Sequence, residues 1–240
     1  MLAALSCIAV GAWQFTTVQI NLEGKITGLF CIGRDFRIPE RAQQTIPIFR
    51  QTAPFGYDGT LYWLIALDPV FEHGTVPYLD DPRVRYRRIL VPALAYSFAL
   101  GNASWTPFAY VSVVLGFVFL GVFATARLFV ANGLSTLHGL WFLLLPATLT
   151  SVDRMTVDVA LAALLAVWLL RPGVLWLRCI VLMAAALTRE TGLLLIVQSL
   201  CGRSGAGIQK MLWLRCWRRF RQRAGMSLWR VTRRHRQRCG

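Results

Sequence analysis

One stretch of the sequence, GYDGTLYWLIALDP at residues 56–69, places carboxylates beside tyrosines in a pattern suited to acid–base chemistry. Asp58 stands between two tyrosines, and such a carboxylate can accept a proton from a hydroxyl group as a general base. Asp68 is the reserve candidate, either for the base or for a metal contact. A structural alternative stays open, in which Asp58 caps the start of a short helix and Asp68 precedes the proline that ends it.

A cluster of arginines follows this stretch, at the entrance to an apolar segment. Guanidinium groups bind phosphate through two parallel hydrogen bonds, so the cluster is a candidate phosphate site. For any single arginine, contact with anionic lipid head groups or with a helix end is the alternative. The members are Arg83, Arg85, Arg87 and Arg88. Asp80 and Asp81, just before them, are weaker carboxylate candidates because they lie in a turn bounded by proline.

Two more groups of ionisable residues interrupt apolar sequence nearer the C-terminus. Arg189 and Glu190 separate two apolar pieces and form a candidate second site, since ionisable groups at membrane depth are costly and often functional. For Asp153, Arg154 and Asp158 a structural role is favoured. Arg154 and Asp158 are four residues apart and could pair on one face of a helix.

The elements that must position these residues follow from the apolar pattern. A helix needs roughly 20 apolar residues to cross the hydrocarbon core of a bilayer, and residues 1–20 and 106–130 reach about that length. Shorter apolar pieces lie at 139–150, 157–170, 174–187 and 192–200. We therefore predict an all-α, multi-pass helical membrane protein with four to six membrane segments. A signal peptide is the alternative for residues 1–20, although no basic residue precedes that run.

A polar region separates the first two long apolar stretches. Residues 21–88 hold nine basic and eight acidic side chains, a density that does not stay in hydrocarbon. The sequence therefore predicts a first transmembrane helix at 1–20 and a long extracytoplasmic loop with interfacial helices at 21–105. Further transmembrane helices are expected at 106–201, followed by a basic tail at 202–240.

The tail accounts for most of the charge of the chain. Twelve of the 26 basic residues and none of the 11 acidic ones lie at 203–240, so the formal charge of +15 falls to +3 before them. A cationic helix on an anionic membrane surface, an arginine-rich nucleic-acid-binding arm and a frame-shifted segment would each have this composition. The frame shift is favoured and nucleic acid is the least favoured partner. A frame shift would remove C-terminal spans and could leave the product inactive.

Cysteine spacing adds no metal or redox site to these candidates. The six cysteines include no C-x-x-C pair and no histidine at ligand spacing, so zinc and thioredoxin-like sites have no support. The 56% content of hydrophobic residues excludes a disordered chain.

Together, GYDGTLYWLIALDP, YRRILVP at 86–92 and LTRETGLLL at 187–195 resemble the multi-pass GT-C-type glycosyltransferases of bacterial cell-envelope polysaccharide assembly. The resemblance covers roughly residues 24–200, and no one motif would suffice alone. The arginine stretch matches the pattern of the family loosely. The family's enzymes have many more spans than 240 residues can hold, so the chain resembles a C-terminally truncated member.

The resemblance implies transfer of a sugar from a polyprenyl-phosphate-linked donor to an envelope glycan or lipid acceptor, with inversion, at the outer face of the membrane. Asp58 would be the base for the acceptor hydroxyl. Arg87 and Arg88, and then Arg85, would stabilise the leaving phosphate. The implied partners are the donor, the acceptor and membrane lipids. The implied location is the bacterial inner (plasma) membrane. No cofactor is certain, and a divalent metal stays open.

A non-enzymatic multi-pass protein, either a transporter fragment or an assembly factor, is the alternative function. The enzymatic and the non-enzymatic function differ in one geometric requirement. An enzyme needs Asp58 and the arginines of 83–88 to converge beside a groove that lipid can enter, whereas an interaction platform does not.

Overall fold

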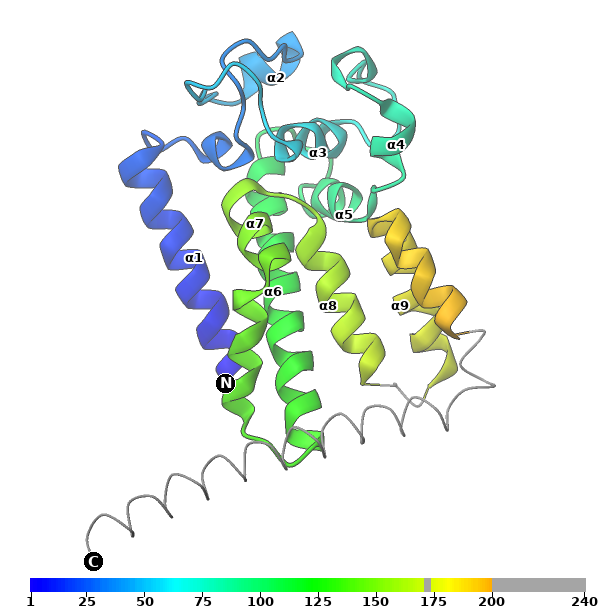
Figure 1. Ribbon diagram of the computed structural model, residues 1–240. Coiled ribbons are helices and arrows are strands. Elements are labelled where there is room, and N and C mark those ends of the chain that lie inside the picture. The colour runs from blue at the N-terminus through cyan, green and yellow to red at the C-terminus, as the bar shows by residue number, and fades with distance from the viewer. Residues whose placement is uncertain (171–173, 200–240) are drawn as a thin grey trace, which may run out of the picture. The chain divides into compact units, whose positions relative to one another are not determined.

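The chain is helical throughout the part that the computed structural model describes, residues 1–170 and 174–199 (Figure 1). No strand occurs in these ranges, which confirms the predicted all-α class. Residues 1–195 form one compact unit, and of the second unit the structure describes only residues 196–199, which are helical. The predicted tail at 202–240 and the end of the predicted span region at 200–201 lie outside the described residues.

Four long helices and several short ones make up the first unit. The long helices are α1 (Leu2–Asn21), α6 (Thr106–Ala131), α8 (Asp158–Leu169) and α9 (Leu175–Thr188). The short α-helices are α2 (Glu40–Thr45), α3 (Asp58–Leu67), α4 (Pro82–Tyr86), α5 (Leu90–Phe98) and α7 (Pro146–Arg154). The 3-10 helices in the described ranges are η1 (Ile26–Phe30), η2 (Val76–Tyr78), η3 (Thr136–Leu144) and η4 (Glu190–Gly192).

Helix α6 is the centre of a bundle formed by the long helices. It packs against α1, α5, α8 and η3, while α9 packs on the far side of α8 (Figure 1). Among the described helices, α1 and α6 are long and apolar enough to cross a membrane, whereas α8 and α9 are apolar but shorter. Pro146 ends η3 and begins α7, so the apolar piece predicted at 139–150 is broken at its proline.

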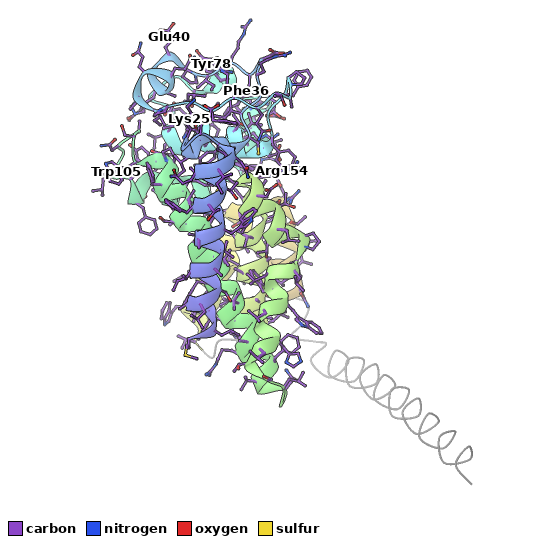
Figure 2. All side chains as sticks on the ribbon, turned by 90° about the vertical axis from the view of Figure 1, so that its left-hand side faces the viewer. Lys25, Phe36, Glu40, Tyr78, Trp105 and Arg154 are labelled. Atoms are coloured by element: carbon purple, nitrogen blue, oxygen red, sulfur yellow. The ribbon has the colours of Figure 1, made fainter. Side chains whose placement is uncertain are left out.

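Residues 22–105, which we call the cap, lie at one end of this bundle (Figures 1 and 2). Apolar side chains on the outer surface of the bundle include Leu5, Ile8, Phe15, Phe119 and Phe123. Figure 2 places Trp105 and Arg154 at the boundary between the cap and the bundle. Tryptophan and arginine are both suited to the interface between hydrocarbon and water.

Helix α3 forms the floor of the cap, and its residues 59–66 are all buried. It contacts η1 and α4 in the cap as well as α5 and α6, so every face of this apolar helix is covered. Trp63 is wholly buried, and its ring lies 5.8 Å from that of Phe30, which in turn lies 5.3 Å from Tyr110 of α6. This aromatic cluster joins the cap to the bundle.

Gly121 of α6 allows η3 to approach the bundle closely, and its replacement tests that packing. A Cβ at this position would overlap the buried ring of Phe142, so Gly121→Ala should lower the unfolding free energy by about 1–3 kcal/mol. Gly116→Ala in the same helix is the matched control. A Cβ there meets no atom within 4 Å, and alanine should raise helix stability by up to about 1 kcal/mol. Denaturant titration in detergent micelles measures both, and equal effects would contradict this packing.

Candidate functional site

Gly59 determines where Asp58 lies. A Cβ on Gly59 would overlap the backbone carbonyl of Arg154 at the end of α7, so only glycine permits this contact between cap and bundle. The next residue, Thr60, donates its hydroxyl to the carbonyl of Phe30 at 2.9 Å. Asp58, the first residue of α3, is thereby held at the boundary between the cap and the bundle.

The carboxylate of Asp58 makes an ion pair instead of capping its helix. Tyr57 is the N-cap residue of α3, and no side chain caps it, so the capping alternative for Asp58 is wrong. Its Oδ2 lies 3.1 Å from Nη1 of Arg85, and the Asp58 side chain is 45% exposed. Within the described residues the other oxygen, Oδ1, has no protein partner. The carboxylate is therefore anchored at one oxygen, and nearly half of the side chain is exposed.

Arg85 binds a second carboxylate more extensively than the first. Its Nε donates to Asp80 Oδ1 at 2.9 Å and its Nη2 to Asp80 Oδ2 at 2.7 Å, the two-pronged geometry of a strong arginine–carboxylate pair. Its guanidinium carbon lies 5.8 Å from the centre of the Tyr62 ring, and its side chain is only 12% exposed. Hydrogen bonding to Asp80 raises the pKa of Arg85 and lowers the pKa of Asp80, so both remain charged.

Arg88 connects the cap to the turn after α9. Its Nε lies 3.1 Å from Oε2 of Glu190, and its Nη1 donates to the hydroxyl of Tyr62 at 3.1 Å. Burial opposes the ionisation of Glu190, but a hydrogen bond from its own backbone and the charge of Arg88 leave its pKa lowered. The structure therefore brings Glu190 of the predicted second site into contact with the arginine cluster.

The four arginines of the cluster thus fall into two groups. Arg85 and Arg88 are largely buried and paired with acids. Arg83 and Arg87 are exposed, and within the described residues neither side chain makes an ion pair. Arg87 is therefore a free cation beside the paired ones.

Arg189 pairs with a residue that we expected to pair elsewhere. Its Nη1 binds Oδ1 of Asp158 at the start of α8, while Oδ2 of Asp158 accepts a hydrogen bond from Thr156. The predicted pairing of Arg154 with Asp158 on one helix face is wrong. Met155 has a left-handed backbone with φ 51° and ends α7, so the two residues belong to different helices.

Arg154 contributes instead to the boundary beside Asp58. Its guanidinium carbon lies 4.5 Å from the centre of the Tyr57 ring, a cation–π contact, and its Nε lies 3.4 Å from Asp153 Oδ2. Tyr57 precedes Asp58, so this contact also orients the start of α3.

Asp68 lies away from these contacts and stabilises a loop. It follows the last residue of α3, as predicted, and its buried carboxylate accepts backbone hydrogen bonds from Glu72, His73 and Thr75. The hydroxyl of Thr75 donates to it as well. Burial opposes ionisation, but these hydrogen bonds outweigh it and lower the pKa of Asp68. Both oxygens are occupied, which is the environment of a structural carboxylate.

A groove of about 740 Å³ opens beside Tyr57, between α1, η3 and α7. Its walls are mostly apolar, and its charged residues, Asp153 and Arg154, lie at the end of α7 that contacts the cap. The lining residues are Ala9, Val10, Trp13, Tyr57, Leu143, Thr148, Leu149, Thr150, Val152, Asp153 and Arg154. The groove therefore runs along the bundle to the residue next to Asp58.

In the part of the chain that the structure describes, no group of three or more His, Cys, Asp or Glu side chains could hold a metal ion. No protein-family model, curated protein or solved structure matches the chain.

Sequence reasoning identified the charged residues but not all of their partners. The buried Tyr62, which lies between Arg85 and Arg88, carried no signal of this role, and Asp80 was only a weak candidate. Neither partner could be identified from spacing, because each contact joins different elements or crosses a turn.

The contacts of Arg88 should make a measurable contribution to stability. Arg88→Ala leaves Glu190 and the Tyr62 hydroxyl without their partner, and hydrogen bonds to charged groups contribute about 1.5–3 kcal/mol. Arg87→Ala, the neighbouring control, removes an exposed arginine and should change stability by less than about 0.5 kcal/mol. Denaturant titration in detergent micelles distinguishes the two, and losses of the same size would contradict the distinction.

Asp68 should make stability depend on acid pH. Its pKa in the folded protein is below the ordinary 3.8, so its contribution is full above that value and is lost as pH falls through the folded pKa. The unfolding midpoint of the wild type should therefore fall between about pH 5 and pH 2. Asp68→Asn should be less stable at neutral pH and should show a shallower fall. Parallel curves for the two proteins would argue against this assignment.

Proposed function

We propose that this protein transfers a sugar from a polyprenyl-phosphate-linked donor to an acceptor hydroxyl, in the manner of GT-C-type glycosyltransferases. The observation that carries the proposal is the ion pair between Asp58 and Arg85, 3.1 Å apart, next in the chain to Tyr57, which lines an apolar groove. A base and a cation thus lie together where a lipid-linked substrate could present its head group. This convergence is what an enzyme needs and an interaction platform does not.

The proposed reaction is an inverting displacement at the anomeric carbon. The acceptor oxygen forms the new bond to that carbon, its proton passes to Asp58, and the bond from the carbon to the phosphate oxygen breaks with its electron pair on oxygen. The leaving polyprenyl phosphate is a weak base and needs no proton, but it gains negative charge. Cations that face this charge lower the barrier.

The arginines divide this work in the proposal. The exposed Arg87 has no acid partner in the described part of the chain, so it can face the leaving phosphate. Arg85 is held by Asp80 and Asp58 and adds its positive charge beside the base. Arg88 is held by Glu190 and Tyr62 and acts by fixing the ring beneath Arg85. In this proposal Asp68 has a structural role, because its two oxygens are already hydrogen-bonded.

The groove supports the proposal that one of the substrates is a lipid. Its walls come from α1, η3 and α7, and α1 is one of the two helices long and apolar enough to cross a membrane. An isoprenoid chain in the groove would place its head group near Tyr57 and Arg154, one residue from the base. We accordingly propose a multi-pass protein of the bacterial inner membrane that acts on an envelope glycan or lipid acceptor.

Replacing Asp58 tests the proposal. The purified protein is offered synthetic polyprenyl-phosphate sugars and membrane-lipid acceptors, and release of polyprenyl phosphate is followed by mass spectrometry. Asp58→Asn should lower this release by about 10²–10⁴-fold, the usual contribution of a general base. Asp35→Asn makes the same chemical change at an exposed position of the cap and should leave release unchanged. Wild-type activity in the Asp58 variant would remove this residue from the mechanism. No release by the wild type from any donor would favour the non-enzymatic alternative.

A further inference from the structure

The proposed reaction assigns no role to Asp80. It lies just before α4 and orients its own carboxylate, since its Oδ1 accepts the backbone N–H of Asp81 at 2.8 Å. The same carboxylate then receives both Nε and Nη2 of Arg85. Its side chain is 56% exposed, whereas that of Arg85 is 12% exposed, so the acid covers the guanidinium from the solvent side.

The division of Arg85 between two acids determines how Asp58 is held. The Nε–Nη2 edge of the guanidinium binds Asp80, and the contact with Asp58 is made through Nη1. A guanidinium without a competing acid prefers the two-pronged arrangement, in which both oxygens of one carboxylate are covered. By holding the Nε–Nη2 edge, Asp80 fixes the guanidinium in an orientation that contacts Asp58 at Oδ2. Oδ1 of Asp58 has no protein partner among the described residues. A carboxylate with both oxygens bound to a guanidinium is a weaker base toward the proton of an acceptor, because the adjacent positive charge favours its ionised form.

We propose that Asp80 is a positioning residue, which holds Arg85 by two hydrogen bonds so that Asp58 keeps one oxygen free for the acceptor hydroxyl. This inference rests on the proposed function for its catalytic consequence but not for its geometry. Asp80 touches neither donor nor acceptor and acts through Arg85. Tyr62 supports the arrangement from below, because its ring faces Arg85 while its hydroxyl is held by Arg88.

Activity of a matched set of variants tests the catalytic consequence. Asp80→Asn removes the charge, frees Arg85 to close on Asp58, and should lower turnover about 10- to 100-fold, with a smaller change in KM for the donor. Asp80→Glu keeps the charge and should retain more turnover than Asp80→Asn. Asp81→Asn is the control, because it makes the same change one residue later and asparagine can still cap α4. Wild-type turnover in Asp80→Asn, or equal losses in the Asp80→Asn and Asp81→Asn variants, would overturn the proposal.

Chemical labelling tests the geometry without any need for activity. A water-soluble carbodiimide with an amine converts accessible carboxyl groups to amides, and peptide mass spectrometry measures the extent at Asp58. In Asp80→Asn the labelling of Asp58 should fall severalfold, because Arg85 then covers both of its oxygens. Asp81→Asn and Asp80→Glu should label like the wild type. Unchanged or increased labelling in Asp80→Asn would overturn the positioning role. A wild type without transferase activity would refute the proposed function and leave this result standing.

Discussion

The complete burial of α3 is the constraint on which the rest of this structure depends. The helix is apolar around its whole circumference, so it is stable only where other elements cover every side. Cap segments cover part of it and α5 and α6 cover the remainder, with Trp63 and Phe30 packed between. This requirement draws the cap onto one end of the bundle and leaves Asp58, at the start of the helix, at the edge of the covered region.

A network of ion pairs surrounds that edge. Arg85 binds Asp58 and Asp80, and Arg88 binds Glu190 and the hydroxyl of Tyr62. Arginines this far from solvent need partners, because an unpaired charge with little access to water carries a large desolvation cost. The consequence is that η4, which follows α9, is tied to the cap through residues about a hundred positions earlier in the chain. The same network holds Asp58 by only one of its oxygens.

The apolar groove links this polar edge to the outer surface of the bundle. Trp13 of α1 and Leu149 of α7 line its walls, and Tyr57 closes it beside Asp58. A substrate with an apolar chain and a charged head group would meet apolar and polar surfaces in the matching order. That arrangement is the physical basis for proposing a lipid-linked donor, and it depends on Gly59, whose missing side chain lets α3 touch the end of α7.

Composition and local pattern determined much of this protein by themselves. Apolar runs of sufficient length predicted α1 and α6, and Asp68-Pro69 predicted the end of α3, because helix formation and termination depend on neighbouring residues. The charged and aromatic residue types of the site could also be identified in the sequence. Only the tertiary structure decided the pairing. Arg154 and Asp158 have suitable helical spacing, but the left-handed Met155 separates them, and Arg189 binds Asp158 instead. Charged side chains at the edge of a buried region pair with whichever opposite charges the packing of apolar helices brings near, and spacing along the chain does not contain that information.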